Sequence, residues 1–372
     1  MINIFNKTWF PMKIYPLIVF LSLRLYTKFS YLVTKTRLNN KINKLIRSKG
    51  LKKLTKEEKK EIQSYYKTQN KDRISFKWHR FYSKCNDVFL ADYVPEDLFY
   101  QKLEPFFNKR DFGVPFMDKN FLTRILPNIK QPETIINNIN GFYFHKGELI
   151  DFERAVSICK KEIGFMVIKP SLDSGGGKNV RLFSGAGKNC DNVGASIDNL
   201  FKNYNKDFLV QKVVEQHPKL SSLNPTSLNT FRVMSFFSET GVEVLSTIIR
   251  MGGENSFTDN GTTGGVSCGV GENGKLNKYG YKLSGERFTA THSGVVFEGY
   301  SLPSVEKMLD VVKTAHKQLP YFKVISWDCA IGAEKEIVLI EFNTNGQGIN
   351  SHQLNNGAVL SKLVKSYAKQ KG

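Results

Sequence analysis

The sequence predicts an α+β protein in which a basic, helical N-terminal segment precedes a body of antiparallel strands and helices. Charge is divided unevenly, because residues 1–85 contain 21 Lys+Arg and only 4 Asp+Glu, whereas the remainder is close to neutral. Short apolar runs typical of strands dominate residues 165–237. Residues 302–318 carry the amphipathic pattern of a helix. These observations favour strands and helices mixed in one body, with the basic segment attached to it.

The length of 372 residues suggests about two domains. We therefore divide the chain into a basic helical segment at 1–85, a first part of the body at 86–164, and a ligand-binding domain at 165–372. The five cysteines are scattered, and no pair has the Cys-x-x-Cys spacing of a zinc or redox site. Free thiols in a reducing compartment follow, which predicts a cytoplasmic protein.

The start of the chain has the pattern of a helix that lies at a membrane surface. Its uncharged stretch, Ile14–Leu23, has ten residues, and about 20 are needed to span a bilayer. A helix that begins at Pro16 would carry two faces, one polar (Arg24, Thr27, Lys28, Tyr31, Lys35) and one apolar (Leu17, Leu21, Leu25, Phe29, Leu32). We expect this segment at an anionic membrane, on its inner face; the alternative is that the helix packs on the body.

Two other partners are not expected. No small-residue cleavage site follows Leu23, so a secretory signal is disfavoured. The near-neutral body argues against nucleic acid as a partner of the core.

Local signals place several elements. Thr55-Lys56-Glu57-Glu58 resembles the start of a helix within the charged residues 35–70. Asp151 is expected to cap a helix that runs to about Glu162. A short strand is predicted at 141–146, a hairpin at 324–343, and a helix at 356–369.

The stretch "MVIKPSLDSGGGKNV", residues 166–180, reads as a strand, a glycine tip and a second strand. It is not a P-loop, because Gly177-Lys178 is followed by Asn179 instead of Ser or Thr. Glycines allow backbone N–H groups to approach phosphate oxygens, and Lys169 supplies a charge at the end of the first strand. The stretch is therefore either a phosphate-binding hairpin or an ordinary hairpin with a mobile tip. Ser174, Gly175, Gly176 and Gly177 are the candidate phosphate-contacting residues.

A second glycine pattern is not a nucleotide motif. Residues 269–274 match Gly-x-Gly-x-x-Gly, but they lie outside a strand-to-helix context. Asn273-Gly274 is a strong turn signal, so a turn is predicted there.

The stretch "SWDCAIGAEKEIVLIEFNTNG", residues 326–346, predicts a metal site on a hairpin. If the loop is even-numbered and centred on Glu334-Lys335, Asp328 lies opposite Glu341. Glu341 and Asn343 then share a face. Opposed carboxylates repel unless a cation lies between them, and an all-oxygen ligand set suits Mg²⁺. The alternative is a solvated hairpin with polar residues on its open face.

Taken in order, these motifs resemble the ATP-grasp superfamily over residues 113–357. The resemblance implies a fold of two α+β subdomains that grip ATP between antiparallel sheets, with ATP and Mg²⁺ as cofactors. "FMDKNFLTRIL" supplies Lys119 as a second phosphate-contacting lysine beside Lys169. "FLVQKVVEQH" matches the hinge strand, which would place Gln211 and the backbone around Val213 at adenine, and Glu215 or His217 near ribose.

A closer resemblance is to the sugar-transfer-associated ATP-grasp group of bacterial polysaccharide gene clusters. It rests on "EQHPKLSSLNPTSLNTFRVMSF", "TDNGTTGGVSCGV" and "HSGVVFEGYSLP". By resemblance, Asn229 and Arg232 lie near the triphosphate or the acyl substrate, and His292 lies at the site. The same resemblance places a loop beside it (Asp259, Asn260, Gly264, Gly265).

The sequence departs from the family pattern at two positions. Gln211 stands where a glutamate is common. Ser326 stands where some ATP-grasp enzymes have an arginine that stabilises the transition state, and Arg232 or Arg250 is expected to take that role.

The resemblance implies an ATP- and Mg²⁺-dependent carboxylate–amine ligase. It would act in surface-polysaccharide or capsule assembly, on a carboxylate-bearing sugar or amino acid. Two rival functions are phosphoryl transfer to a sugar hydroxyl and a non-catalytic ATP-sensing or membrane-binding module.

Overall fold

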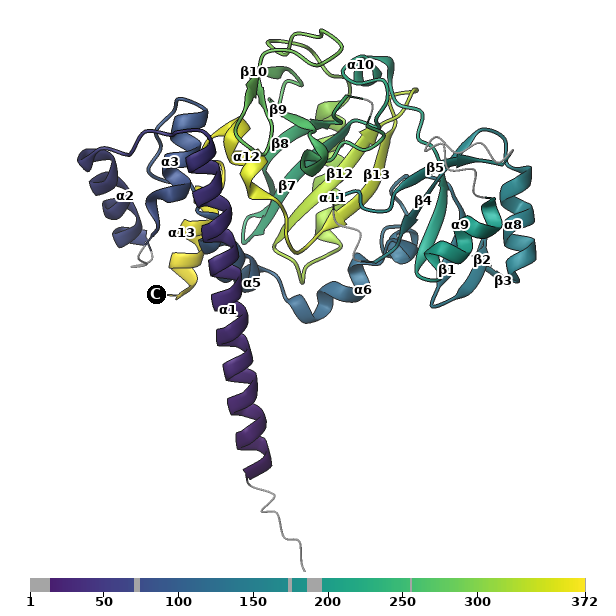
Figure 1. Ribbon diagram of the computed structural model, residues 1–372, viewed down its shortest axis with the longest axis horizontal. Helices are drawn as coiled ribbons and strands as arrows, with labels where there is room; N and C mark the ends of the chain where they lie inside the picture. Colours follow the sequence, from purple (N-terminus) through teal and green to yellow (C-terminus); the bar gives the residue numbers. More distant parts are fainter. Residues whose placement is uncertain (1–13, 70–73, 173–175, 186–195, 255, 372) are drawn as a thin grey trace, which may run out of the picture.

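The protein has two antiparallel sheets side by side, with helices packed against each of them (Figure 1). The computed structural model describes residues 14–69, 74–172, 176–185, 196–254 and 256–371. Mixed helices and antiparallel sheets confirm the predicted α+β class. The glycine-loop residues Ser174 and Gly175 lie outside the described part of the chain.

The first sheet has six strands in the order β3-β2-β1-β6-β4-β5. Two helices, α8 and α9, share an apolar core with it. As predicted, Asp151 caps α8, because its carboxylate accepts a hydrogen bond from Arg154 N at 2.7 Å. The elements are β1 (Thr134–Ile139), β2 (Phe142–His145), β3 (Glu148–Ile150), α8 (Phe152–Lys161), β4 (Phe165–Pro170), β5 (Arg181–Ser184), α9 (Ile197–Tyr204) and β6 (Phe208–Lys212).

The second sheet has seven strands in the order β11-β10-β9-β8-β7-β12-β13. The predicted hairpin at 324–343 is β12 with β13. The strands are β7 (Thr230–Ser238), β8 (Gly241–Met251), β9 (Val266–Val270), β10 (Leu276–Tyr281), β11 (Arg287–Phe288), β12 (Val324–Ile331) and β13 (Ile337–Asn343). Residues 271–274 form a turn, as predicted, with Gly274 N bonded to Gly271 O.

Alternation along the central strands separates two faces of the second sheet. Val233 on β7 and Trp327 on β12 belong to the core that includes α11 (Val305–Lys317). Side chains alternate across a strand, so Arg232 and Asp328 point to the opposite face. That face is partly covered by the second core, which includes α13 (Ser361–Lys371). The polar residues of the site therefore lie on the face away from α11.

Short helices connect these layers. Before the first sheet come α4 (Glu96–Leu98), the π-helical turn η1 (Phe99–Leu103), α5 (Glu104–Phe107), η2 (Arg110–Phe112), α6 (Gly113–Met117), η3 (Lys119–Phe121) and α7 (Leu122–Ile125). Later in the chain come α10 (Pro218–Ser221), η4 (Gly261–Thr263) and α12 (Ile349–Asn356). The single helix predicted at 356–369 is wrong at its start: α12 ends at Asn356 and α13 begins at Ser361. Gly357 between them has a φ of 76°, which a continuous helix does not accept.

The basic segment forms α1 (Ile14–Ser48), α2 (Lys56–Gln69) and α3 (Phe76–Cys85). Thr55 and Glu58 make the reciprocal bonds of a capping box, which confirms the predicted helix start. Figure 1 shows the first part of α1 projecting from the body and its second part lying against it. Ile42 and Ile46 join a core with Trp78, so this part of α1 packs on the body. Across the described residues, no helix combines the length and hydropathy that crossing a bilayer requires.

The boundary that we placed at 164/165 divides one sheet. Strands β1–β3 precede it and β4–β6 follow it, yet β1 pairs with β6 through Asn137 and Leu209. This pairing joins segments far apart in sequence, and local patterns carry no information about it. The first structural unit therefore extends past 165 to the end of β6.

A buried histidine predicts acid sensitivity of the fold. His316 is fully buried, and burial lowers its pKa to about 4. The unfolded chain takes up a proton below about pH 6.5, whereas the folded protein does not until about pH 4. The free energy of unfolding should therefore fall as pH drops across this range. The protonation of His316 should account for up to about 3 kcal/mol of that decrease. Urea unfolding from pH 7 to 4 should show a shallower pH slope in His316→Gln; an equal slope would contradict the prediction.

Candidate active site

A cavity of about 280 Å³ lies between the two sheets. The first sheet contributes Lys169 from β4 and Gln211 from β6. The second sheet contributes residues of four strands, all on the face away from α11 (Thr230, Arg232, Arg250, Asp328, Glu341). Residues predicted from separate motifs thus meet in one place.

Asp328 is the centre of an ion-pair cluster. Its Oδ1 accepts from Arg232 Nε at 2.8 Å, and its Oδ2 accepts from Arg232 Nη2 at 2.7 Å. Arg250 Nη2 lies 3.1 Å from the same Oδ2. Burial would raise the pKa of Asp328, but the two guanidinium groups hold it below its ordinary value. Asp328 is therefore ionised in the cavity and fixes both arginines.

Arg250 also connects the cluster to the loop that follows β8. Its Nη2 lies 3.0 Å from Asp259 Oδ2, and it donates to Thr230 Oγ1 at 2.7 Å. Thr230 donates in turn to Asp259. Burial raises the pKa of Asp259, and the nearby charge of Asp328 acts in the same direction. Thr230 was missed in the sequence, although it stands two residues before Arg232 and hence shares its face.

The metal hairpin has the predicted pair but a different register. Asp328 lies opposite Glu341, as expected. The next pair is Cys329 with Leu339, so the even-numbered loop that we assumed is wrong, and Ile340 is an extra residue. This β-bulge changes which residues of β13 face the core. Leu339, before the bulge, faces the core, and Phe342, after the bulge, also faces the core. Glu341 therefore lies on the cavity side of the strand.

Two lysines lie near Glu341. Lys119 Nζ is 3.1 Å from Glu341 Oε2. Lys169 is 8% exposed, and burial lowers its pKa to about 8; the charge of Lys119 lowers it further, whereas Glu341 and Asp328 oppose the shift. The lining of the cavity has five basic side chains (Lys169, Arg181, Lys212, Arg232, Arg250) against three carboxylates, which is an environment suited to a polyanion.

The glycine loop contacts the loop that follows β8. Asn260 donates to the carbonyl of Gly176, and a side chain on Gly177 would lie 3.3 Å from Thr258. Gly176 and Gly177 have φ of 82° and 68°, which favour glycine. The two segments close over the cavity from opposite sheets. Gly264, at the end of this second loop, also has a positive φ, and a side chain on Gly265 would meet the Asn260 carbonyl.

The hinge strand is only partly as expected. Gln211 and Val213 line the cavity. The Gln211 amide donates to Thr134 Oγ1 at 3.0 Å, and Val213 N donates to Phe165 O. Glu215 and His217 do not line it. The chain turns away there, because Glu215 O accepts from Ala333 N, and His217 Nδ1 accepts from Lys219 N at the start of α10.

Two further predicted residues lie away from the cavity. Asn229 is fully buried, and its amide donates to Leu220 O at 2.7 Å and Asn224 O at 2.8 Å. It organises the loop before β7 and does not face the phosphate side. His292 lies on a separate cavity of about 90 Å³ beside Asn224. The resemblance gave the positions of these residues in the chain but not the directions of their side chains.

The donor set fits Mg²⁺. Among the described residues no three His, Cys, Asp or Glu side chains gather as a metal cluster, but Mg²⁺ needs only one or two carboxylates, with waters and phosphates as its other ligands. Asp328 Oδ1 accepts one arginine bond and keeps a second lone pair. Asn343 stands two residues after Glu341 on the same face, and its amide Oδ1 can serve as a third oxygen ligand. Glu341, Asp328 and Asn343 would hold the ion.

Two antiparallel sheets with a basic, carboxylate-centred cavity between them define a nucleotide-gripping α+β fold. The family model described as sugar-transfer associated ATP-grasp matches residues 98–369. The chain therefore belongs to this ATP-grasp family, and ATP and Mg²⁺ are its expected cofactors.

Solved structures show low similarity to the chain. The biotin carboxylase domain of Hydrogenobacter thermophilus 2-oxoglutarate carboxylase is 15% identical, with a TM-score of 0.40, over 68% of this chain and 45% of that one. D-cycloserine synthetase DcsG is 12% identical, with a TM-score of 0.40, over 69% of this chain and 71% of that one. D-alanyl-alanine synthetase A of Vibrio cholerae is 11% identical, with a TM-score of 0.37, over 68% and 65%. No curated protein matches the chain.

Proposed function

We propose that the protein is an ATP- and Mg²⁺-dependent carboxylate–amine ligase. The observation that carries this proposal is the single cavity in which Lys169, Arg232 and Arg250 lie around the Asp328–Glu341 pair, with Lys119 paired to Glu341. Among these residues no Ser, Cys or His is paired with a base as a nucleophile. The arrangement suits a reaction in which the protein orients the reactants and offsets phosphate charge.

The reaction balances in two steps. An oxygen of the substrate carboxylate attacks the γ-phosphorus of ATP, and ADP leaves. The amine then attacks the acyl carbon, the C–N bond forms, and phosphate leaves with the carboxylate oxygen, while the nitrogen gives up one proton to solvent. Lys169 and Lys119 hold phosphate oxygens, and Arg232 or Arg250 offsets the charge of the transferring phosphoryl group. Bound Mg²⁺ supplies positive charge to the same oxygens.

We also propose that ATP binds with its adenine at Gln211 and Val213 and with its phosphates under Gly176 and Gly177. Lining of the cavity by all four residues supports this orientation. The substrates proposed are an amino acid or other amine and a uronic-acid carboxyl, in cytoplasmic steps of surface-polysaccharide or capsule assembly. This choice rests on the sugar-transfer association of the family.

Isotope transfer tests the reaction class. With ¹⁸O in the carboxylate of a uronic acid and an amino acid as amine, a ligase should release ADP and phosphate that contains ¹⁸O. Phosphoryl transfer to a hydroxyl would instead give a sugar phosphate whose carboxylate keeps the ¹⁸O, and no labelled inorganic phosphate would form. No ADP release with any carboxylate–amine pair would favour the non-catalytic alternative.

A membrane role for α1 is proposed as well. Leu25, Phe29 and Leu32 are 67%, 66% and 58% exposed and fall along one face of the helix. The surrounding residues 1–85 are strongly basic. An exposed apolar stripe with basic neighbours is typical of a helix that binds anionic bilayers.

Substitution of the stripe should abolish that binding. The triple variant Leu25→Ser, Phe29→Ser, Leu32→Ser removes exposed side chains, so it should leave the thermal unfolding midpoint unchanged. It should lose sedimentation with phosphatidylglycerol vesicles that the wild type binds at low salt. If the wild type ignores these vesicles, or the variant binds them equally, the membrane proposal fails.

A further inference from the structure

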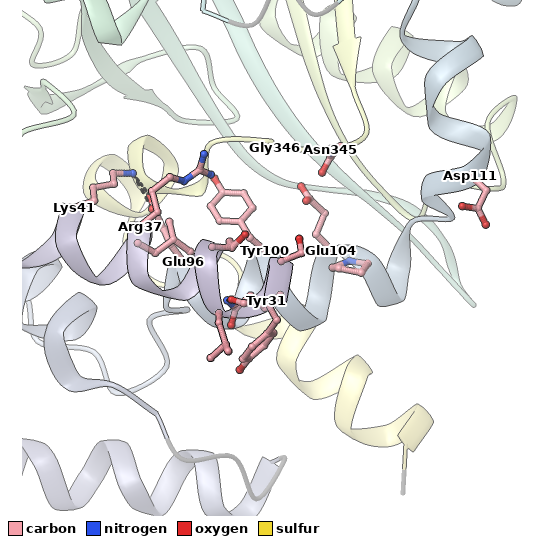
Figure 2. A pocket seen from close by; sticks show the side chains of 15 residues that line it. Tyr31, Arg37, Lys41, Glu96, Tyr100, Glu104, Asp111, Asn345 and Gly346 are labelled. Carbon is pink, nitrogen blue, oxygen red and sulfur yellow. Dashed lines mark hydrogen bonds and ion pairs between the residues drawn. The ribbon is translucent and has the colours of Figure 1, made fainter. Parts of the chain in front are cut away.

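A second, larger cavity lies between α1 and the body, at about 1420 Å³. Its walls come from α1, from η1 and α5, and from the segment that follows β13 (Figure 2). Small-molecule pockets are typically about 300–1,000 Å³. The cavity therefore has room for more than an amino acid, and no step of the proposed reaction yet uses it.

The lining carries the groups that recognise sugars. Tyr31 and Tyr100 offer ring faces for the apolar side of a pyranose, which aromatic side chains pack against. Ser30, Thr34, Gln101 and Asn345 line the same cavity and can exchange hydrogen bonds with hydroxyl groups. Leu32, Leu38 and Pro105 add apolar surface, so both the hydroxyl groups and the apolar side of a pyranose have partners in this cavity.

Arg37 places a positive charge in the cavity, whose lining also carries Lys41 and three carboxylates (Glu96, Glu104, Asp111). Lys41, one turn along α1, is paired with Glu96 at 2.8 Å. Arg37 makes no ion pair or hydrogen bond with any residue that the structure describes. Figure 2 shows its side chain reaching from α1 toward Gly346, next to Tyr100. A carboxylate or phosphate on a bound sugar would give this guanidinium a partner.

The cavity borders the candidate active site through residues 345–348. Asn345 and Gly346 line it, two and three residues after Asn343. Gly348 N donates to Tyr100 OH at 3.1 Å, and Gln347 N donates to Glu104 Oε1 at 3.4 Å. On the other side, a side chain on Gly348 would lie 3.5 Å from Arg232 Nη1. One short segment thus lines the cavity and passes beside the arginine that pairs with Asp328.

We infer that the cavity under α1 is a subsite for an anionic saccharide, whose charged group is held by Arg37. The role of this saccharide as the ligase's substrate rests on the proposed function. The α1 wall lies before residue 98, where the family match begins, so this subsite is built partly from a helix outside the matched region.

Ligand-observed NMR with the full chain tests the inference, using D-glucuronate, D-glucose and acetate as probes at 150 mM NaCl. Glucuronate should bind best, because it carries both the hydroxyl groups and the charge. Arg37→Gln should weaken glucuronate binding about tenfold, whereas Arg47→Gln, an exposed arginine on the same helix outside the cavity, should not. Thr34→Trp, which occupies the cavity without changing charge, should also abolish it.

Four results would overturn the inference: no glucuronate binding, equal binding of acetate, equal binding of glucose, or no effect of Arg37→Gln. Vesicle sedimentation is run in parallel. If Arg37→Gln reduces binding to phosphatidylglycerol vesicles and leaves glucuronate binding unchanged, the cavity binds lipid headgroups instead. ATP titration of the same samples distinguishes failure of the subsite from failure of the proposed function. If the wild type does not bind ATP, the ligase proposal is wrong. If the wild type binds ATP but not glucuronate, only the subsite inference is wrong.

Discussion

Glu341→Gln is expected to reduce turnover about 100-fold or more while the protein stays folded. Glutamine keeps the shape of the side chain and removes one negative charge beside Asp328 and Lys119. The charge is needed because the carboxylate would hold the cation that offsets the transferring phosphoryl group. Losing one such electrostatic contribution typically costs about 10²–10³ in kcat.

Stability should change little in this variant. The side chain of Glu341 is 27% exposed. Removing its charge relieves repulsion with Asp328, which is stabilising. It also leaves Lys119, which lies near Lys169, without its carboxylate partner, which is destabilising. The two effects oppose each other. Thermal unfolding of the variant should therefore stay close to that of the wild type, and this separates a lost function from a lost fold.

The measurement is ADP release with magnesium titrated. Glu334→Gln is the matched control, because Glu334 is exposed in the turn of the same hairpin and should turn over like the wild type. Asn343→Asp should be milder than Glu341→Gln, since it keeps an oxygen ligand. Wild-type turnover of Glu341→Gln at limiting magnesium would show that this hairpin does not hold the metal.

Lys169→Ala is expected to weaken ATP binding at least tenfold, about 1.4 kcal/mol. Lys169 is buried at the end of β4, where the glycine loop begins, so its ammonium has few waters to replace a phosphate partner. Lys161→Ala, on the exposed end of α8, removes the same charge away from the cavity and should bind ATP normally.

The affinity of the wild type should also depend on pH. With a pKa of about 8, Lys169 is charged below pH 8 and loses its proton above it. Phosphate favours the charged form, so ATP binding should weaken as pH rises from 7 to 9. Lys169→Ala should lack this dependence. Calorimetric titration with ATP at pH 7 and pH 9 checks this dependence. If Lys169→Ala binds ATP as tightly as the wild type at pH 7, Lys169 does not contact the phosphates.

Much of the architecture could be predicted because its signals are local. The capping box at Thr55 and the cap at Asp151 depend on residues three apart, and both were found. The hairpin at 324–343 is visible as two apolar runs around a turn. The boundary placed at 164/165 divides the first sheet because β1 pairs with β6 across some 70 residues, and no local pattern encodes such a pairing.

Side-chain direction limited the prediction of the site. His217 and Asn229 stand in segments that resemble the family, yet His217 bonds to Lys219 N at the start of α10, and Asn229 holds its own loop. Both are polar residues that satisfy backbone groups locally, which is a common use of such side chains. A sequence motif gives the position of a residue but not the direction of its side chain.

The sequence alone determined the chemistry that the protein can carry: the lysines, arginines and carboxylates, their order, and the strands that bear them. Only the tertiary structure decided how they meet. Arg232 and Arg250 reach Asp328 because β7 lies between β8 and β12. Glu341 reaches the cavity because the extra residue Ile340 reverses the alternation of β13. Without that bulge, Glu341 would share the core face of Leu339, since side chains in a regular strand repeat every two residues.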